Sequence, residues 1–253
     1  MNFKFNNLRV YVEENYEAMS KRAAHILASQ VHLKPEGTIG LATGGTPVGM
    51  YKELVRMHKE AGLDLSGITT FNLDEYYPIT RDNLQSYYYF MADNLFNHIN
   101  IPKERIHIPN GMAEDINKEC ESYENKIKEA GGIDLQILGI GENGHIGFNE
   151  PGKKFEALTH LVNLDENTIE INSRFFDSIE EVPQKAITMG IKTIMQARKI
   201  VLLANGSKKA EIIKRTIAGD ITPEVPASIL QLHHDTTIVL DKAAASEVIS
   251  LLI

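Results

Sequence analysis

The sequence lacks the features that mark disulfide-linked, exported or membrane-spanning proteins. It has one cysteine, Cys120, in 253 residues, so no internal disulfide can form and a reducing cytoplasm is the expected location. No apolar run reaches the roughly 18 residues of a membrane-spanning helix. The N-terminal segment also lacks the apolar core of a signal peptide. We therefore expect neither a membrane partner nor export by that route.

Positive charge is scarce as well. The chain has 26 Lys and Arg against 34 Asp and Glu, which gives a formal net charge of −8. An acidic surface repels nucleic acids and anionic membranes, so we expect neither as a partner. Any anionic ligand must then be held by local cations or main-chain N–H groups. A content of 43% hydrophobic and 24% charged residues is typical of a folded globular protein.

The sequence lacks the residue patterns of two classes of catalytic centre, nucleophilic serine or cysteine sites and metal sites. No Gly-x-Ser-x-Gly nucleophile motif occurs, and Cys120 lies between two glutamates in a predicted helix, where negative charge disfavours a thiolate. The sequence His233-His234-Asp235 has neither the i, i+4 spacing of helical metal ligands nor a clear third ligand. We interpret it as a loop and expect no metal site.

Short apolar runs alternate with longer amphipathic segments along most of the chain. This pattern predicts an α/β fold with a doubly wound, mostly parallel, Rossmann-like sheet and helices on both faces. Leu8 to Val12 alternates with period two, which indicates a half-buried strand near a sheet edge. Further strands are predicted at 38–42, 68–73, 135–140, 200–204 and 237–240, and helices around 48–60, 83–97, 115–130, 207–218 and 242–252.

No repeat, low-complexity run or flexible linker divides the chain, so we expect residues 1–253 to form a single domain. Residues 153–183 are the exception to the regular pattern, because they lack a clear apolar strand and carry mixed charges. This composition fits either a mobile lid over a site or an ordinary surface insertion.

Ligands of open parallel sheets bind beyond the carboxyl ends of the strands, so the residues after each predicted strand are the site candidates. The first such group is Thr43, Gly44, Gly45 and Thr46, at the predicted start of a helix. The glycines allow close approach of the main chain to a ligand, and the hydroxyls and helix N-terminus favour a phosphate. The same residues also fit a plain strand-to-helix turn.

Two adjacent carboxylates, Asp74 and Glu75, follow the next predicted strand. Side chains alternate along an extended chain, so we expect one of the two to face the cleft. A carboxylate there can act as a general base next to a carbonyl, especially if burial raises its pKa. Solvated loop acids are the alternative interpretation.

The segment 141–150 has the highest density of functional groups. Its glycines surround Asn143, His145 and Glu150. A carboxylate can fix the tautomer of an imidazole and increase its basicity, while an amide can orient the partner, so these residues suggest a proton shuttle. A structural or exposed histidine is the alternative.

Two cations are candidates for holding a phosphate. Lys209 ends the segment 205–209, where a predicted strand meets a helix, and Arg174 lies in the segment 172–176. A guanidinium can bind phosphate oxygens in a bidentate manner, although single basic residues are most often solvated surface groups.

In the segments 41–47, 71–76, 86–88, 141–151 and 172–176 the sequence resembles the glucosamine-6-phosphate deaminase family. The resemblance covers essentially the whole length and implies a fold shared with ribose-5-phosphate isomerase and 6-phosphogluconolactonase. It implies that His145, supported by Glu150 and Asn143, opens the sugar ring. Asp74 then moves a proton from C2 to C1, and water releases ammonium to leave fructose 6-phosphate.

By the same resemblance, Thr43, Gly44, Gly45, Thr46, Arg174 and Lys209 hold the phosphate of the amino sugar. The segment 153–183 corresponds to the lid of the family, and neither a metal nor an organic cofactor is implied. Some family members have Asp where this chain has Asn143, which can orient a partner but cannot stabilise an imidazolium by charge. We therefore give Glu150 the larger supporting role.

Three other functions stay open at this point. A 6-phosphogluconolactonase would hydrolyse an ester and needs no proton transfer at C2, so the pair Asp74 and His145 favours the deaminase. A deaminase preferring galactosamine 6-phosphate would use the same groups. A catalytically silent sugar-phosphate sensor would keep the phosphate loop and lose the bases, whereas Asp74, His145 and Glu150 are all present.

The resemblance also yields a regulatory prediction. Hexameric members that N-acetylglucosamine 6-phosphate activates have a basic cluster after the position of Pro151 and an extended C-terminal tail. This chain has Lys153, His160, Val162 and Asn163 there and stops at Ile253. We expect a monomer or small homo-oligomer in which activation by N-acetylglucosamine 6-phosphate is absent or weak. A clear leftward shift of the substrate saturation curve in steady-state kinetics would contradict this prediction.

Overall fold

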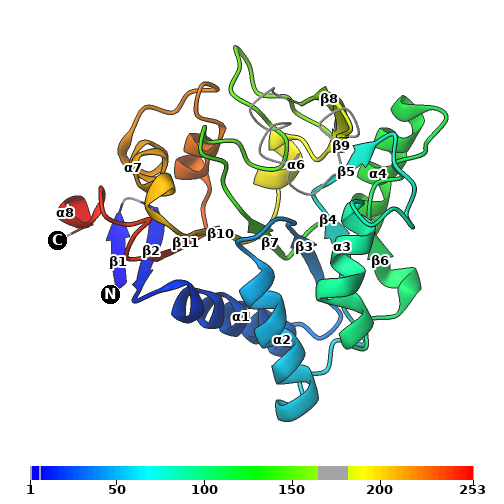
Figure 1. The fold of residues 1–253 in the computed structure, drawn as a ribbon, viewed down its shortest axis with the longest axis horizontal. Coiled ribbons are helices and arrows are strands. Elements are labelled where there is room, and N and C mark those ends of the chain that lie inside the picture. The colour runs from blue at the N-terminus through cyan, green and yellow to red at the C-terminus, as the bar shows by residue number, and fades with distance from the viewer. Residues whose placement is uncertain (1, 6, 165–181, 253) are drawn as a thin grey trace.

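The structure, a computed structural model, describes residues 2–5, 7–164 and 182–252. Its larger sheet contains β1 (Asn2–Phe5), β2 (Leu8–Glu13), β3 (Thr38–Leu41), β4 (Thr69–Asn72), β6 (Ile106–His107), β7 (Leu135–Leu138), β10 (Ile200–Ala204) and β11 (Thr236–Asp241). These strands lie in the order β1-β2-β11-β10-β7-β3-β4-β6 (Figure 1). All neighbouring pairs are parallel except β1 and β2, where the chain turns back on itself at the sheet edge.

The described α-helices are α1 (Tyr16–Leu33), α2 (Val48–Ala61), α3 (Tyr87–Asn94), α4 (Ile116–Glu129), α6 (Ile191–Met195), α7 (Ala210–Ala218) and α8 (Ile249–Leu252), with short 3-10 helices η1 (Phe96–His98), η2 (Lys103–Arg105), η4 (Ser207–Lys209) and η5 (Pro226–Leu232). Polar side chains set where several begin. Asn15, Ser86 and Asp115 each accept a hydrogen bond from the main-chain N–H three residues later, at the starts of α1, α3 and α4. None of the helices in the described ranges combines the length and apolar character needed to cross a bilayer.

The order of the strands reverses between β3 and β7. From β3 the chain proceeds outward through β4 to β6, and from β7 it proceeds the other way through β10 to β11. Because parallel crossovers are right-handed, opposite directions place helices on opposite faces. Figure 1 shows α1 and α2 on one side of the sheet and α7 on the other. The predicted doubly wound α/β sheet is thus confirmed, and its switch point lies between β3 and β7.

A second, antiparallel sheet adjoins this switch point. It consists of β5 (Asp74–Tyr77), β9 (Lys185–Thr188) and β8 (His160–Asn163), in that order. Only Leu73 separates the end of β4 from the start of β5. The N–H of Leu73 donates to Leu41 O in the large sheet, and its carbonyl accepts from Met189 N. Asp74 is therefore held where the two sheets meet.

Burial on both faces of the sheet explains why the central strands appear in the sequence as continuous apolar runs. Every residue of β3, β7, β10 and β11 is buried, since helices cover both faces of the sheet. One hydrophobic cluster extends from Leu8 to Val248. In α1, Met19, Ala23 and Leu27 are buried in this cluster, and Ile26 packs partly buried against it.

The structure corrects three local predictions. The helix predicted at 242–252 is present only as α8, because turns that start with Asp241 accepting from Ala244 N occupy 242–248. The helix at 83–97 is shorter and begins at the Ser86 cap, and that at 207–218 begins with the 3-10 helix η4. A short strand, β8, lies within 153–183, while residues 165–181 of the expected lid fall outside the described ranges.

A buried carboxylate ties the opposite end of the sheet together. Asp134 accepts hydrogen bonds from Lys34 Nζ, Arg198 Nη1 and the main-chain N–H of Thr38. Burial alone would raise the pKa of Asp134, but these hydrogen bonds and the nearby Lys34 and Arg198 charges lower it below its ordinary value. The carboxylate thus stabilises the fold in its ionised form.

We expect Asp134→Ala to lower the free energy of unfolding by roughly 2–3 kcal/mol at pH 7, measured by urea denaturation. The folded-state pKa is depressed, so the contribution is present above the unfolded pKa and is lost as pH falls through the folded pKa. The difference from wild type should therefore shrink below about pH 4. Replacing the exposed Asp220 by Ala is the control, and an equal loss in both variants would refute the assignment.

Candidate active site

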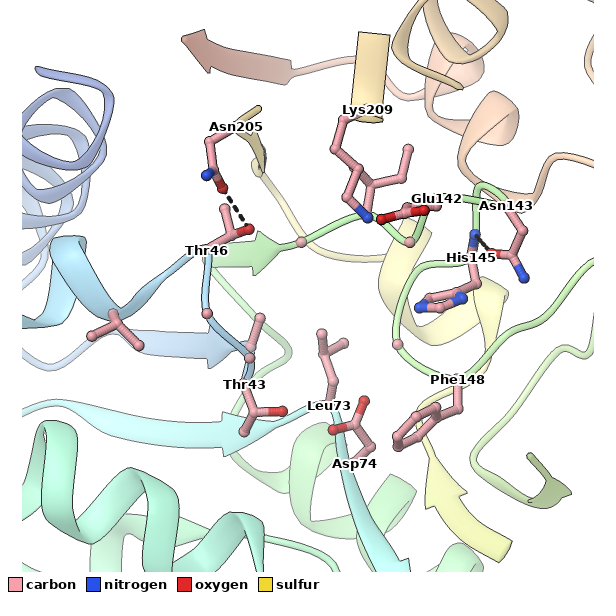
Figure 2. A pocket seen from close by; sticks show the side chains of 18 of the residues that line it. Thr43, Thr46, Leu73, Asp74, Glu142, Asn143, His145, Phe148, Asn205 and Lys209 are labelled. Atoms are coloured by element: carbon pink, nitrogen blue, oxygen red, sulfur yellow. Dashed lines mark hydrogen bonds between the residues drawn. The ribbon is translucent and has the colours of Figure 1, made fainter. Parts of the chain in front are cut away.

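A cavity of about 970 Å³ opens at the carboxyl ends of the strands around the switch point. The loops after β3, β7 and β10 and the first residue of β5 line it. This is the location at which doubly wound sheets bind ligands, and the volume suits a small molecule. Figure 2 shows Thr46, Asn205 and Lys209 toward one end of the cavity and Asp74, Phe148 and His145 toward the other.

The loop after β3 offers main-chain donors to the cavity. Within the described part of the chain, the N–H groups of Thr43, Gly44, Gly45 and Thr46 donate no hydrogen bond. Gly44 has a φ of 93°, and a Cβ at Gly44 or Gly45 would meet no atom within 4 Å. Donors beside open space form an anion-binding arrangement, to which the start of α2 adds a favourable dipole.

The hydroxyl of Thr46 is already engaged. Thr46 Oγ1 donates to Asn205 Oδ1 at 2.9 Å, which joins the loop after β3 to the loop after β10 (Figure 2). The predicted hydroxyl donor of Thr46 is thus committed to a protein partner. Its main-chain N–H stays available.

Asp74 and Glu75 have different surroundings because alternate residues of β5 face opposite sides. Asp74 lines the cavity and is 5% exposed. Burial, and secondarily the charge of Glu75, raises the pKa of Asp74 to about 8, while a hydrogen bond from the Thr43 side chain opposes the shift. The expectation that one of the two carboxylates faces the cleft is confirmed, and that one is Asp74.

Glu75 instead anchors α3. Its carboxylate accepts hydrogen bonds from the main-chain N–H groups of Tyr76, Tyr87 and Tyr88 at 2.8–2.9 Å. Burial raises the pKa of Glu75 to about 7, against the effect of these three hydrogen bonds. Because Tyr87 and Tyr88 open the helix, Glu75 fixes the position of α3.

An aromatic wall stands beside Asp74. The Tyr87 ring is stacked on Phe148 with ring centres 6.0 Å apart, and Tyr76 lies 4.7 Å from Tyr87. Tyr87 and Phe148 line the cavity. The wall excludes water from the carboxylate and contributes to its raised pKa. Tyr87 belongs to the segment 86–88 that carries the family resemblance, but it was not among the predicted site residues.

His145, Glu150 and Asn143 form one hydrogen-bonded group. His145 Nδ1 lies 3.1 Å from Glu150 Oε2, which also accepts from Asn143 Nδ2 at 2.7 Å. A carboxylate only accepts, so the proton of this bond lies on Nδ1 and leaves Nε2 as the acceptor. The main-chain N–H of His145 donates to Asn143 Oδ1 at 3.2 Å, so Asn143 contacts the main chain of His145 rather than the imidazole ring (Figure 2).

Two glycines make this loop possible. A Cβ on Gly141 would overlap the His145 ring, so the ring packs directly on the main chain. Gly147 has a φ of 58°, and a Cβ there would lie 2.9 Å from Thr188 Oγ1 and 3.6 Å from Asp74 Oδ2. The loop is fastened to β9, since Phe148 N donates to Thr188 Oγ1 and Asn149 Nδ2 to Met189 O.

Among the residues that the structure describes, the lysines that line the cavity come from η4. Lys208 and Lys209 both line it, and burial lowers the pKa of Lys209 while the charge of Glu142, another lining residue, raises it. Arg174 lies outside the described residues. Asn205, Glu142 and Tyr16 also line the cavity and were not among the predicted site residues. Nothing near Tyr16 in the sequence marks it, because it lies far from the other site segments.

Comparison with known proteins shows the family of the chain. Residues 12–239 match the family model described as glucosamine-6-phosphate isomerases/6-phosphogluconolactonase. The chain belongs to this family. It is 63% identical over 237 residues to glucosamine-6-phosphate deaminase of Alkaliphilus oremlandii, covering 94% of this chain and 98% of the relative. It is 61% identical over 240 residues to the Clostridium botulinum deaminase, covering 95% and 98%.

Solved structures of the family give the same result. A monomeric glucosamine-6-phosphate deaminase superimposes with a TM-score of 0.92 at 47% identity, covering 94% of this chain and 99% of that one. A 6-phosphogluconolactonase from Trypanosoma brucei has a TM-score of 0.75 at 20% identity, covering 96% of this chain and 98% of that one. The second likeness shows a shared fold alone.

The two groups for which the sequence predicted no catalytic or metal-binding role, Cys120 and His233 to Asp235, lie outside the lining of the cavity. Cys120 is buried in α4, and burial, with the nearby glutamates, raises the pKa of its thiol to about 11. His233 lies in a loop, as predicted, with Nε2 2.8 Å from Ala197 O. No group of three or more metal-ligating side chains occurs among the described residues.

The raised pKa of Asp74 predicts a change in stability. We expect Asp74→Asn to raise the free energy of unfolding by roughly 1–3 kcal/mol at pH 8, since it removes a buried charge. The folded-state pKa is raised, so the protonated Asp74 contributes stability to the wild-type protein, and this contribution is lost as pH rises from the unfolded pKa toward about 8. The gain should therefore grow between pH 5 and pH 8 in thermal or urea unfolding.

Glu75→Gln is the matched control for this measurement. An amide cannot replace all three acceptor contacts of Glu75, so this variant should lose stability. Asp74→Asn being no more stable than wild type at any pH between 5 and 9 would overturn the assigned environment of Asp74.

Proposed function

We propose that the chain converts glucosamine 6-phosphate and water to fructose 6-phosphate and ammonium. One observation carries the proposal: the lining of one cavity combines unpaired N–H groups and a lysine with a buried carboxylate and a carboxylate-bound histidine, and Thr46 lies toward one end while Asp74 and His145 lie toward the other (Figure 2). This polarity matches a sugar with a phosphate at C6 and its reacting carbons at C1 and C2. The names of the relatives above favour deamination over lactone hydrolysis.

The phosphate lies against the N–H groups of Thr43, Gly44, Gly45 and Thr46, with Lys209 supplying charge. In an acidic protein these local donors compensate for the unfavourable net charge of −8. Partial burial of Lys209 strengthens its attraction to a dianion. We assign Arg174 to the same phosphate on the family resemblance.

Ring opening is the task of His145. With its proton on Nδ1 bound to Glu150, Nε2 accepts the proton of the anomeric hydroxyl and returns it to the ring oxygen. Glu150 stabilises the transient imidazolium, and Asn143 holds Glu150 in place. The product of this step is the open-chain aldehyde.

Isomerisation is the task of Asp74. Its carboxylate takes the proton from C2 while the ammonium group of the substrate passes a proton to the C1 carbonyl oxygen, which forms an enolamine. Asp74 then delivers the C2 proton to C1, which leaves a protonated imine at C2. Water adds at C2 and ammonia leaves, taking up a proton to become ammonium. A pKa near 8 makes the ionised carboxylate a stronger base than an ordinary aspartate.

We also propose the organisation in which this site works. The main hydrophobic cluster, which extends from Leu8 to Val248, supports one domain over residues 1–253. The resemblance to a monomeric deaminase supports a monomer or small homo-oligomer. A free cysteine and a metabolic sugar-phosphate substrate support a cytoplasmic location, without nucleic acid or membrane partners.

The test is ammonium release by the purified protein from glucosamine 6-phosphate, coupled to detection of fructose 6-phosphate. We expect equal amounts of both products, and a loss of at least about 1,000-fold in kcat for Asp74→Asn with substrate binding retained. Parallel assays with galactosamine 6-phosphate and 6-phosphogluconolactone separate the alternatives. Turnover of the lactone alone would overturn the proposal.

A second variant tests the division of labour. We expect His145→Gln to reduce turnover of the cyclic substrate roughly 100-fold or more, because it removes the ring-opening base. Turnover of an open-chain analogue, which bypasses this step, should fall much less. Equal losses on both substrates in steady-state assays would contradict the role of His145.

A further inference from the structure

Tyr16 connects the start of α1 to the loop after β3. Its Oη donates a hydrogen bond to Gly45 O at 3.0 Å and accepts one from the N–H of Gly49, in the first turn of α2, at 2.8 Å. A Cβ on Gly49 would lie 2.3 Å from Ser20 Oγ and 3.0 Å from this oxygen, so glycine allows α2 to approach both side chains of α1. The tyrosine lines the cavity, but its proton is directed at Gly45 rather than at a ligand.

The contact fixes the orientation of one peptide group. The bond between Gly45 and Thr46 is trans, so its C=O and N–H point in opposite directions. With Gly45 O held by Tyr16, the N–H of Thr46 is directed away from the tyrosine. This N–H is one of the four unpaired donors of the loop.

A second tyrosine acts in the same way at the other end of the loop. Tyr51, fully buried in α2, donates to Ala42 O. The peptide between Ala42 and Thr43 is also trans, so the N–H of Thr43 points away from Tyr51. Two hydroxyls from different helices thus occupy carbonyls at the two ends of the run of unpaired N–H groups.

The loop requires such outside contacts because its own sequence does not hold it. Gly44 and Gly45 are consecutive, and neither has contacts at its Cβ position that would limit rotation. Ordering two glycines on binding costs conformational entropy, which a preorganised loop avoids. A contact that fixes Gly45 in the free protein therefore increases affinity for the anion.

We propose that Tyr16 is a positioning residue for phosphate binding, whose hydroxyl holds the Gly45–Thr46 peptide with its N–H toward the substrate phosphate. This inference rests on the proposed function for the identity of the substrate. The part of the inference that concerns phosphate binding rests on the loop geometry alone.

The test compares Tyr16→Phe with Tyr123→Phe. Tyr123 is a buried tyrosine of α4 whose hydroxyl donates to Asn72 O and His107 O, outside the cavity lining. Inorganic phosphate is the probe, with its Kd measured by calorimetry, and kcat and KM are measured with glucosamine 6-phosphate. Melting temperatures report the general structural effect of each substitution.

Tyr16→Phe should raise the phosphate Kd and the KM by a common factor of roughly 5–10 with kcat within twofold of wild type. Tyr123→Phe should lower the melting temperature and leave the phosphate Kd unchanged. An unchanged Kd and KM in Tyr16→Phe would overturn the proposal, as would a wild-type protein that binds no phosphate. Wild-type phosphate binding without ammonium release, again weakened by Tyr16→Phe, would sustain this inference and refute the proposed function.

Discussion

The adjacency of β3 and β7 at the switch point is the constraint on which the rest of the site depends. The loops that leave these parallel strands diverge to opposite faces, so the space beyond their carboxyl ends stays open. One loop contributes unpaired N–H groups and the other contributes the histidine. The short passage from β4 into β5 then inserts Asp74 between them.

The second sheet supplies what an open parallel sheet alone cannot. Asp74 pairs with Thr188 in β9, and Thr188 also receives the N–H of Phe148 from the histidine loop. A single strand thereby aligns the carboxylate with the loop that carries His145. The resulting burial of Asp74 costs stability and increases basicity, which is the exchange expected of a catalytic carboxylate.

Sequence patterns predicted the parts that burial and chemistry determine locally. The apolar runs located the central strands, and the positions after them located Thr43, Asp74 and His145, which the structure places around one cavity. The antiparallel strands β5, β8 and β9 were missed because they are four residues long and partly polar. Tyr16 was missed because its role arises from a contact with Gly45, 29 residues away. The turns at 242–248 replaced a predicted helix because Asp241 caps a turn instead.

The central claim is that one buried carboxylate carries a proton from C2 to C1. The most direct measurement uses glucosamine 6-phosphate deuterated at C2 and follows the label in the first fructose 6-phosphate formed. Because Asp74 is shielded from solvent, we predict that a measurable fraction of the deuterium appears at C1. Complete loss of the deuterium to water with none at C1, or turnover of this substrate by Asp74→Asn at the wild-type rate, would contradict the account.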